Sequence, residues 1–213
     1  MINCVLIDGT YLEIQSLKEI NDREIATQIK EIDCFRNKLE TLEGIEECIN
    51  LQTLNCSGNW LETLEGLEKC INLQTLNCSN NQLGMPKNKK DYDNYVECLF
   101  MSGMGRYGYD RTLFEYECIK GLENCNKLTI LDCSYNLLQS LEGLEKCTEL
   151  REIDCSCNGL HYSKDDRLYT LKALSTCNKL RIIKCNQNAI NDLDGLENCK
   201  KLKELSCDSS TNV

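Results

Sequence analysis

Leucine and cysteine recur at fixed positions along most of the chain. The recurring unit reads L-x-x-L-x-C-x-x-N-x-L-x-x-L-x-G-L-x-x-C-x-x, which is 22 residues long. Its seven copies start at Ile29, Leu51, Leu73, Leu128, Leu150, Leu180 and Leu202. Repetition with a period of 20 to 50 residues is typical of proteins in which one small structural unit stacks on the next.

The spacing within one unit predicts its local structure. Leu54 and Cys56 are two residues apart, which places both side chains on one face of a short strand. The later apolar positions Leu61, Leu64 and Leu67 are three apart, which favours a 3₁₀ turn or a short helix. A single strand, turn and helical return cannot bury its own apolar face, so the units are expected to stack strand beside strand.

This unit resembles the leucine-rich repeat family, with Cys at a position where Leu is more common. Its length and its L-x-x-L-x-x-C second half resemble the subclass found in a regulatory subunit of protein phosphatase 1. The resemblance implies an α/β fold. It would be a right-handed solenoid with about eight parallel strands on a concave face and short 3₁₀ or helical returns on a convex face. It also implies that the chain binds other proteins.

The repeats define a single continuous domain with a cap. Residues 1–28 precede the first full copy and are expected to form an N-terminal cap, which residues 29–213 follow as repeats. The long interval between Leu73 and Leu128 contains a degenerate copy at 96–104, which would supply the eighth repeat strand.

Three segments interrupt the repeat pattern, at 84–95, 105–116 and 161–169. The last two follow the strand positions of their units, so both loops are expected to leave the same edge of the sheet. They are rich in Tyr and Arg, which protein interfaces favour at their energetic centre. The loop residues expected to contact a partner are Arg106, Tyr107, Tyr109, Arg111 and Tyr162. The alternative is that these rings pack locally and hold the loops in place.

The outward-facing strand positions predict a second binding surface on the concave face. Most of these positions hold small polar residues, which apolar side chains such as Ile130 and Ile182 interrupt. The residues predicted to bind a partner on this face are Phe35, Phe100, Asp132, Tyr135, Asp154 and Lys184. A run of Asn, Ser and Thr is equally what a solvated face would carry.

The chain has 17 cysteines, and 13 of them occupy the two core columns of the repeat. In a secreted chain this number would indicate disulfides, but the N-terminus shows no signal peptide. We therefore expect reduced thiols in a reducing, cytoplasmic compartment, or in a virion if the protein is a viral structural component. The Cys155-Ser156-Cys157 pair has one inward and one outward side chain, so neither a metal site nor a cofactor is expected.

The net charge, the length of the apolar stretches and the single His argue against several classes of function. The net charge of −10 argues against a nucleic acid partner, and no apolar stretch is long enough for a membrane-spanning helix. A single His and the absence of a nucleophile–base pair argue against an enzyme. The sequence thus predicts a non-catalytic module that binds a protein.

Two alternatives remain, a structural subunit of a large assembly such as a viral particle and a phosphatase-regulatory adaptor. Leu202, Leu205 and Cys207 are expected at a partly uncovered C-terminal end, which another chain or copy would cover.

Overall fold

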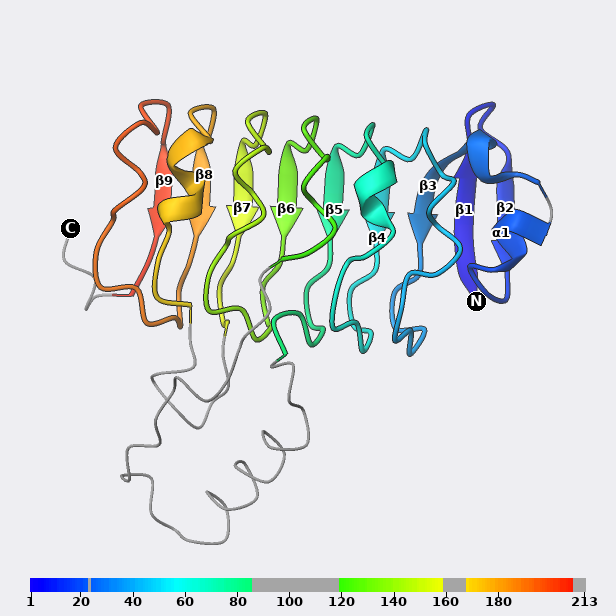
Figure 1. Ribbon diagram of the computed structural model, residues 1–213, viewed down its shortest axis with the longest axis horizontal. Coiled ribbons are helices and arrows are strands. Elements are labelled where there is room, and N and C mark those ends of the chain that lie inside the picture. Colours follow the sequence, from blue (N-terminus) through cyan, green and yellow to red (C-terminus); the bar gives the residue numbers. More distant parts are fainter. Residues whose placement is uncertain (23, 86–118, 159–167, 209–213) are drawn as a thin grey trace, which may run out of the picture.

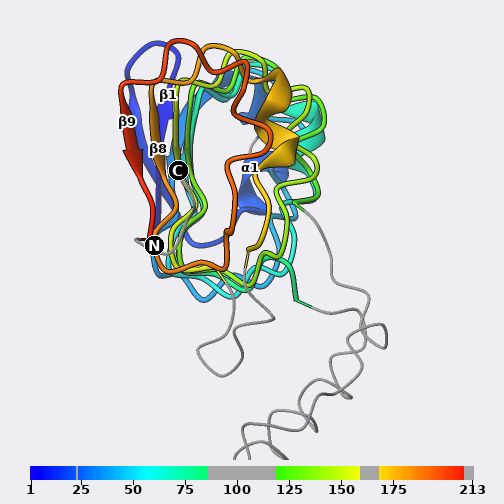
Figure 2. The same cartoon turned by 90° about the vertical axis from the view of Figure 1, so that its left-hand side faces the viewer.

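The computed structural model describes residues 1–22, 24–85, 119–158 and 168–208. The chain coils into a right-handed solenoid whose successive turns stack along one axis (Figure 1). Seen along that axis, the strands form one wall of the coil and the returns form the other (Figure 2). This is the leucine-rich-repeat solenoid that the repeat pattern predicts.

In the described residues, nine strands form one open sheet in the order β2-β1-β3-β4-β5-β6-β7-β8-β9. Strands β3 to β9 are parallel, and equivalent repeat positions lie side by side, so that Leu54 is in register with Leu76. The strand bounds are β1 Ile2–Leu6, β2 Tyr11–Ile14, β3 Ile29–Asp33, β4 Thr53–Asn55, β5 Thr75–Asn77, β6 Ile130–Asp132, β7 Glu152–Asp154, β8 Ile182–Lys184 and β9 Glu204–Ser206.

The returns contain only short helical turns, as the three-residue spacing predicts. Their bounds are α1 Glu19–Asp22, η1 Ala26–Gln28, η2 Leu67–Lys69 and η5 Lys172–Thr176. The repeat glycine in the returns makes the close approach between units possible. Gly121 has a φ of +101°, and a Cβ built there would lie 2.1 Å from the carbonyl oxygen of Leu64.

Within the described residues, seven of the about eight predicted repeat strands are present, and all seven are parallel. β5 pairs directly with β6, and the Asn136 side chain bridges the two units through the carbonyls of Cys78 and Cys133. Residues 96–104, for which the sequence predicts the eighth strand, lie outside the described residues.

The N-terminal cap combines a β-hairpin with a short helical return, in which Leu17 and Ile20 are buried. β1 pairs antiparallel with β2 on one side and with β3 on the other. The hairpin turn contains Asp8, whose side chain accepts a hydrogen bond from the backbone N–H of Thr10, and Gly9 with a φ of +87°. The buried side chains of Ile2 and Cys4 extend the apolar core into this hairpin.

The cysteines fill the space between the two walls. Thirteen of those in the described residues are buried, and all fifteen described cysteines are free thiols. Cys34 Sγ donates to the Asn55 carbonyl of the next unit at 3.3 Å, and Cys125 Sγ donates to the Leu67 carbonyl of the preceding unit at 3.4 Å. Burial raises the pKa of Cys34 and Cys70 to about 12. The columns therefore act as small apolar side chains with weak hydrogen-bond donors.

A ladder of buried asparagines satisfies the backbone where each strand ends. Asn59 Nδ2 donates to the carbonyls of Cys34 and Cys56, while its Oδ1 accepts from the N–H groups of Asn37 and Leu39. Asn81, Asn136, Asn158 and Asn188 repeat the donor pattern across successive units. These residues stabilise the fold.

The C-terminal end of the stack is partly uncovered. Within the described residues, β9 pairs only with β8. Leu202, Leu205 and Cys207 are half-buried, whereas the equivalent residues of the preceding unit, Leu180, Ile183 and Cys185, are fully buried. The last unit therefore leaves apolar surface and an open strand edge exposed.

Candidate protein-binding surface

Two columns of side chains cover the outer face of the sheet, here called the sheet face, which corresponds to the expected concave face. In β4 and β5 both columns are neutral, with Thr in the first and Asn in the second. In β6 to β8 the two columns hold apolar and charged side chains instead of neutral polar ones. There the first column holds Ile130, Glu152 and Ile182, and the second holds Asp132, Asp154 and Lys184.

The second column also shapes the turn that follows each strand. Asp132 Oδ1 accepts hydrogen bonds from the backbone N–H of Ser134 at 3.0 Å and from its hydroxyl at 2.6 Å. Asp154 Oδ1 accepts from the N–H of Ser156 at 3.0 Å. Asn55 and Asn77 make the same bond to the residue two positions further on. Asp132 and Asp154, chosen from sequence as contact residues, are therefore also turn-forming residues.

The residue three positions beyond this column is left-handed in every unit from the first to the sixth. The residues, with φ between 52° and 68°, are Arg36, Gly58, Asn80, Tyr135, Cys157 and Gln187. Gly and Asn accept this conformation easily, whereas other L-residues lose about 1–2 kcal/mol in it. Tyr135 and Cys157 are thus placed on the rim of the sheet face at a cost to the fold.

Tyr135 is the most exposed of the predicted contact residues that the structure describes, at 59%. A hydrogen bond with Cys157 raises the pKa of Tyr135, and the nearby charge of Asp154 adds to this effect. Cys157 Sγ in turn donates to Gln187 Oε1 at 3.3 Å. The ring therefore lies over the neighbouring β7 unit, close to the second column.

The remaining predicted residues divide into two groups. Lys184 Nζ lies 3.9 Å from Asp154 Oδ2, which joins it to the Tyr135 region. Phe35 is 47% exposed, with the Arg36 guanidinium 4.9 Å from its ring centre, but β3 is three strands from β6, or about 14 Å. The structure thus brings together Asp132, Tyr135, Asp154 and Lys184, and places Phe35 apart from them.

The other predicted contacts fall in the insertions at 105–116 and 161–169, except for Phe100, which belongs to the degenerate copy at 96–104. Phe100, Arg106, Tyr107, Tyr109, Arg111 and Tyr162 lie outside the described residues. Their described flanks are Met85 and Ile119 for the first insertion, and Asn158 and Leu168 for the second. Asn158 lies four residues beyond the end of β7 and Met85 lies eight beyond the end of β5, and these two strands are about 10 Å apart.

Trp60 was not predicted as a contact residue. It is 48% exposed and lines a hollow of about 390 Å³ together with Glu40, Thr41, Glu62 and Gln82. Its sequence signal was available, because a Trp at a variable repeat position is an aromatic residue that the core does not need.

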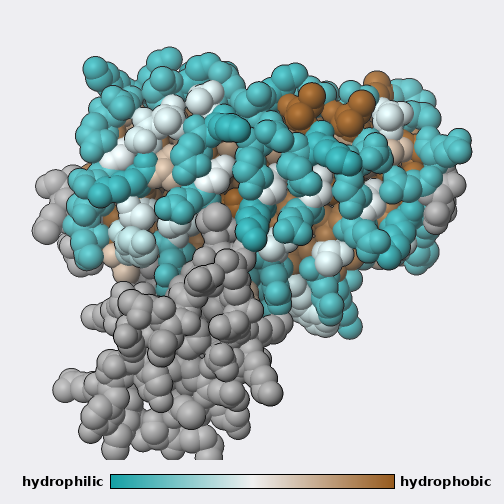
Figure 3. All heavy atoms as spheres, in the orientation of Figure 1, coloured by the Kyte–Doolittle hydropathy of each residue, from teal (hydrophilic) through white to brown (hydrophobic). Residues whose placement is uncertain are grey.

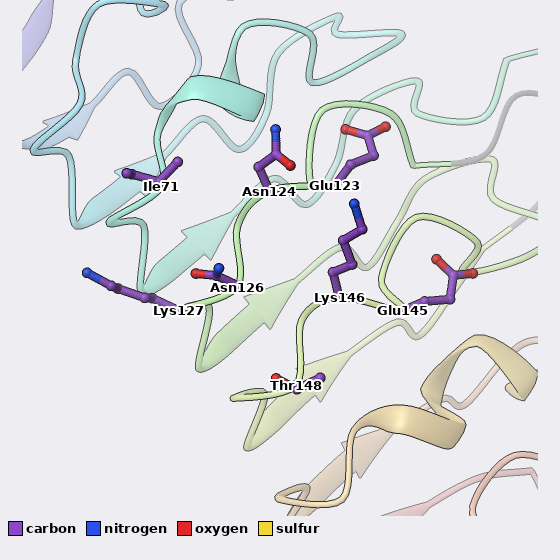
Figure 4. Close-up of a pocket in the computed structure, with 8 residues that line it drawn as sticks. All are labelled: Ile71, Glu123, Asn124, Asn126, Lys127, Glu145, Lys146 and Thr148. Carbon is purple, nitrogen blue, oxygen red and sulfur yellow. The ribbon is translucent and has the colours of Figure 1, made fainter.

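The return side offers weaker surface features. Ile49 and Ile71 are exposed in successive returns, and Figure 3 shows a mainly hydrophilic face with a small hydrophobic group at its upper edge. Beside Ile71 lies an open hollow of about 690 Å³, lined by Glu123, Asn124, Asn126, Lys127, Glu145, Lys146 and Thr148 (Figure 4). Its charges have both signs and its side chains do not converge on one point.

Exposed aromatic, apolar and charged groups meet on the sheet face, at Tyr135, Ile130 and Lys184. In the described ranges, no three potential metal ligands lie close enough together to hold an ion. None of the helices in this part of the chain is long and apolar enough to cross a membrane.

Comparisons with known proteins agree with this architecture. The family model for leucine-rich repeats, described as two copies, matches residues 27–69 and 49–87. No curated protein matches the chain. Among solved structures, the functional domain of InlJ from Listeria monocytogenes, which includes a cysteine ladder, has a TM-score of 0.59 at 26% identity. That match covers 86% of this chain and 31% of InlJ, so the chain spans about a third of that relative.

A second structural relative is internalin C2 from Listeria monocytogenes, with a TM-score of 0.50 at 19% identity over 88% of this chain and 76% of that one. It agrees with the fold. The chain is a leucine-rich-repeat solenoid, and the family match supports the leucine-rich repeat family. Domains of this kind generally mediate protein–protein interaction.

Proposed function

We propose that this protein is a non-catalytic interaction module that binds a protein partner through the sheet face and the adjacent Tyr- and Arg-rich insertions. The observation that carries the proposal is the exposure of Tyr135 on the rim of the sheet face in a left-handed conformation. The left-handed backbone at an exposed aromatic residue lowers the stability of the fold, and the free energy of binding a partner would compensate for this loss.

The surroundings of Tyr135 support the same proposal. Ile130, at the start of the same repeat strand, is 40% exposed, and the charged second column passes between the two residues. An aromatic anchor, an apolar contact and a charged rim are the parts of a protein interface. The flanks of both insertions lie at this edge, so a partner on the sheet face would reach the insertions as well.

The cellular location belongs to the same proposal. Buried free thiols in two columns suit a reducing compartment, so we propose an intracellular, cytoplasmic location, or a virion for a viral component. A second candidate function is a structural subunit of a larger assembly, in which another chain or copy covers the half-buried Leu202, Leu205 and Cys207. A third candidate is a phosphatase-regulatory adaptor, and its support is limited to the length and pattern of the 22-residue repeat.

The replacement Tyr135→Asn is expected to separate binding from folding. Asn80 occupies the same position with a φ of 55°, so Asn at residue 135 should maintain the free energy of unfolding or raise it by up to about 1 kcal/mol. The loss of the ring should lower recovery of the partner about tenfold, as expected for an aromatic anchor. Affinity purification from native cells with quantitative mass spectrometry, paired with thermal melting, measures both effects.

Tyr11→Ala is the matched control, because Tyr11 is 83% exposed on β2 and lies outside the second column. It should leave recovery of the partner unchanged. Unchanged recovery with Tyr135→Asn, or a loss of more than about 1 kcal/mol of stability, would assign the ring to the fold instead.

A further inference from the structure

The turns after β6 and β7 do not require the negative charges of Asp132 and Asp154 in the second column. Asn55 and Asn77 form the same turn through the same Oδ1 atom as Asp132 and Asp154 do. The carboxylates of Asp132 and Asp154 nevertheless lie on directly paired residues of β6 and β7, where like charges repel. An amide would support the turn without this repulsion, so the fold does not explain the two negative charges.

The first column also differs in β6, β7 and β8 from its composition in β4 and β5. Glu152 lies between Ile130 and Ile182 in register, whereas β4 and β5 have Thr at this position. We call Ile130, Asp132, Glu152, Asp154 and Ile182, with Tyr135 at the rim, the central patch. Within the described residues, the ion pair that these three carboxylates make is that of Asp154 Oδ2 with Lys184 Nζ, at 3.9 Å.

We infer that the central patch binds an extended, arginine-containing segment of a protein partner, with guanidinium groups over Asp132 and Asp154 and apolar side chains over Ile130 and Ile182. This inference rests on the proposed function and names the chemistry of the partner. It follows from charge complementarity, because an apolar or acidic segment would cover three carboxylates, of which Lys184 is paired with Asp154 alone.

The geometry favours Arg and an extended backbone. A planar guanidinium donates along two edges, so it can bridge two carboxylates on strands about 4.8 Å apart and stack on an exposed Tyr ring. Lys offers a single point charge and no flat face. In an extended segment, alternate side chains are about 7 Å apart, which equals the distance between the first and second columns along one strand.

A defined probe tests the inference with the full chain. It is a short fluorescent peptide in which Arg and Val alternate at every second position, separated by Ser. Versions with Lys or Glu in place of Arg serve as comparisons. The Arg peptide should bind more tightly than the Lys peptide, and the Glu peptide should not bind. Hydrogen exchange of the wild-type protein should slow at 130–135 and 152–157 when the Arg peptide is added.

Two double variants are compared: one removes two charges from the sheet face, and the other removes two charges from the returns. Asp132→Asn with Asp154→Asn keeps the turn acceptors that Asn55 and Asn77 use, and it should weaken binding of the Arg peptide about tenfold. Glu65→Gln with Glu142→Gln removes two exposed charges from the returns and should leave binding unchanged.

Three results overturn the inference: no binding of the Arg peptide, equal weakening by both pairs of variants, or protection outside the central patch. The exchange measurement uses the wild-type chain, so the inference stays testable even if a variant fails to fold. If the Asp variants retain the native partner while Tyr135→Asn loses it, the arginine inference fails and the proposed function stands. If neither set of variants affects the native partner, both fail.

Discussion

Raising the pH above about 9 is expected to unfold the protein cooperatively, because its buried thiols ionise in the unfolded chain but not in the solenoid. Burial raises the pKa of Cys34, Cys48 and Cys125 from 9.0 to about 12. Below pH 9 the thiols are protonated in both states, so they add no pH dependence there. Between about 9 and 12 the unfolded state releases protons first, so stability falls as the pH rises.

The size of this effect follows from the number of buried thiols. One pH unit above 9, each buried thiol favours the unfolded state by about 1.4 kcal/mol. Burial raises the pKa of twelve cysteines to about 11 or higher, and together they contribute about 17 kcal/mol, which exceeds the about 5–15 kcal/mol that stabilises a typical domain. Circular dichroism during an alkaline titration, combined with the ultraviolet absorbance of thiolates, should show simultaneous unfolding and ionisation.

Cys56→Ala with Cys78→Ala provides the control for the titration. Both thiols are fully buried, and burial raises the pKa of each well above its ordinary value. Their removal should lower stability at neutral pH through the cavities that it creates. It should also reduce the fall in stability by about 1.4 kcal/mol per pH unit for each thiol removed. Stability that stays constant from pH 9 to 11 would contradict the buried columns.

Asn158→Ala is expected to lower the free energy of unfolding by about 4 kcal/mol. Asn158 is completely buried, and its Nδ2 donates to the carbonyls of Cys133 and Cys155 at 3.2 and 2.8 Å. Its Oδ1 accepts from the N–H of Leu138 at 3.2 Å. Alanine leaves three buried backbone groups without partners, each at a cost of about 1–3 kcal/mol.

Asn37→Ala is the matched control within the same ladder. Asn37 is only half-buried, and its side chain bonds to the backbone of Met1 and Phe35 at the exposed end of the stack. Water can replace these bonds, so the loss should be about 1 kcal/mol. Urea unfolding curves measure both values. Equal losses for the two variants would mean that the ladder does not seal the interior of the stack.

The repeat spacing was sufficient to predict the architecture. Alternation of Leu54 and Cys56 fixed the inward face of the strand, and the structure confirms it, with Cys155 buried and Cys157 half-exposed. The degenerate copy at 96–104 matched the unit in part but has Met104 where other copies have the ladder Asn. The Asn amide joins the backbones of neighbouring units, so this copy departs from the repeat at the residue that links one unit to the next.

The cap shows a signal that the repeat pattern concealed. Leu17 and Ile20 match the phase of the repeat, which favoured a half unit at the N-terminus. Asp8-Gly9, between two segments rich in β-branched and apolar residues, is a strong hairpin signal in its own right. The antiparallel hairpin covers the end of the sheet, so it replaces a repeat unit as the N-terminal boundary of the core.

The candidate surface was predicted less completely than the fold. Sequence position showed that Asp132 and Tyr135 face outward, but not that the first closes a turn or that the second is left-handed. Both facts depend on backbone geometry that the turn imposes after the strand is formed. The grouping of Ile130, Glu152 and Ile182 also required the register of β6, β7 and β8.

Site-specific photo-cross-linking tests most directly the central claim that the sheet face binds a protein partner. A photoreactive phenylalanine would replace Tyr135 on the rim of the sheet face and, in a second protein, Glu65 on the returns. The account predicts that, in native cells, residue 135 cross-links to one defined protein and residue 65 does not. Cross-linking from residue 65 alone, or equal cross-linking from both residues, would contradict it.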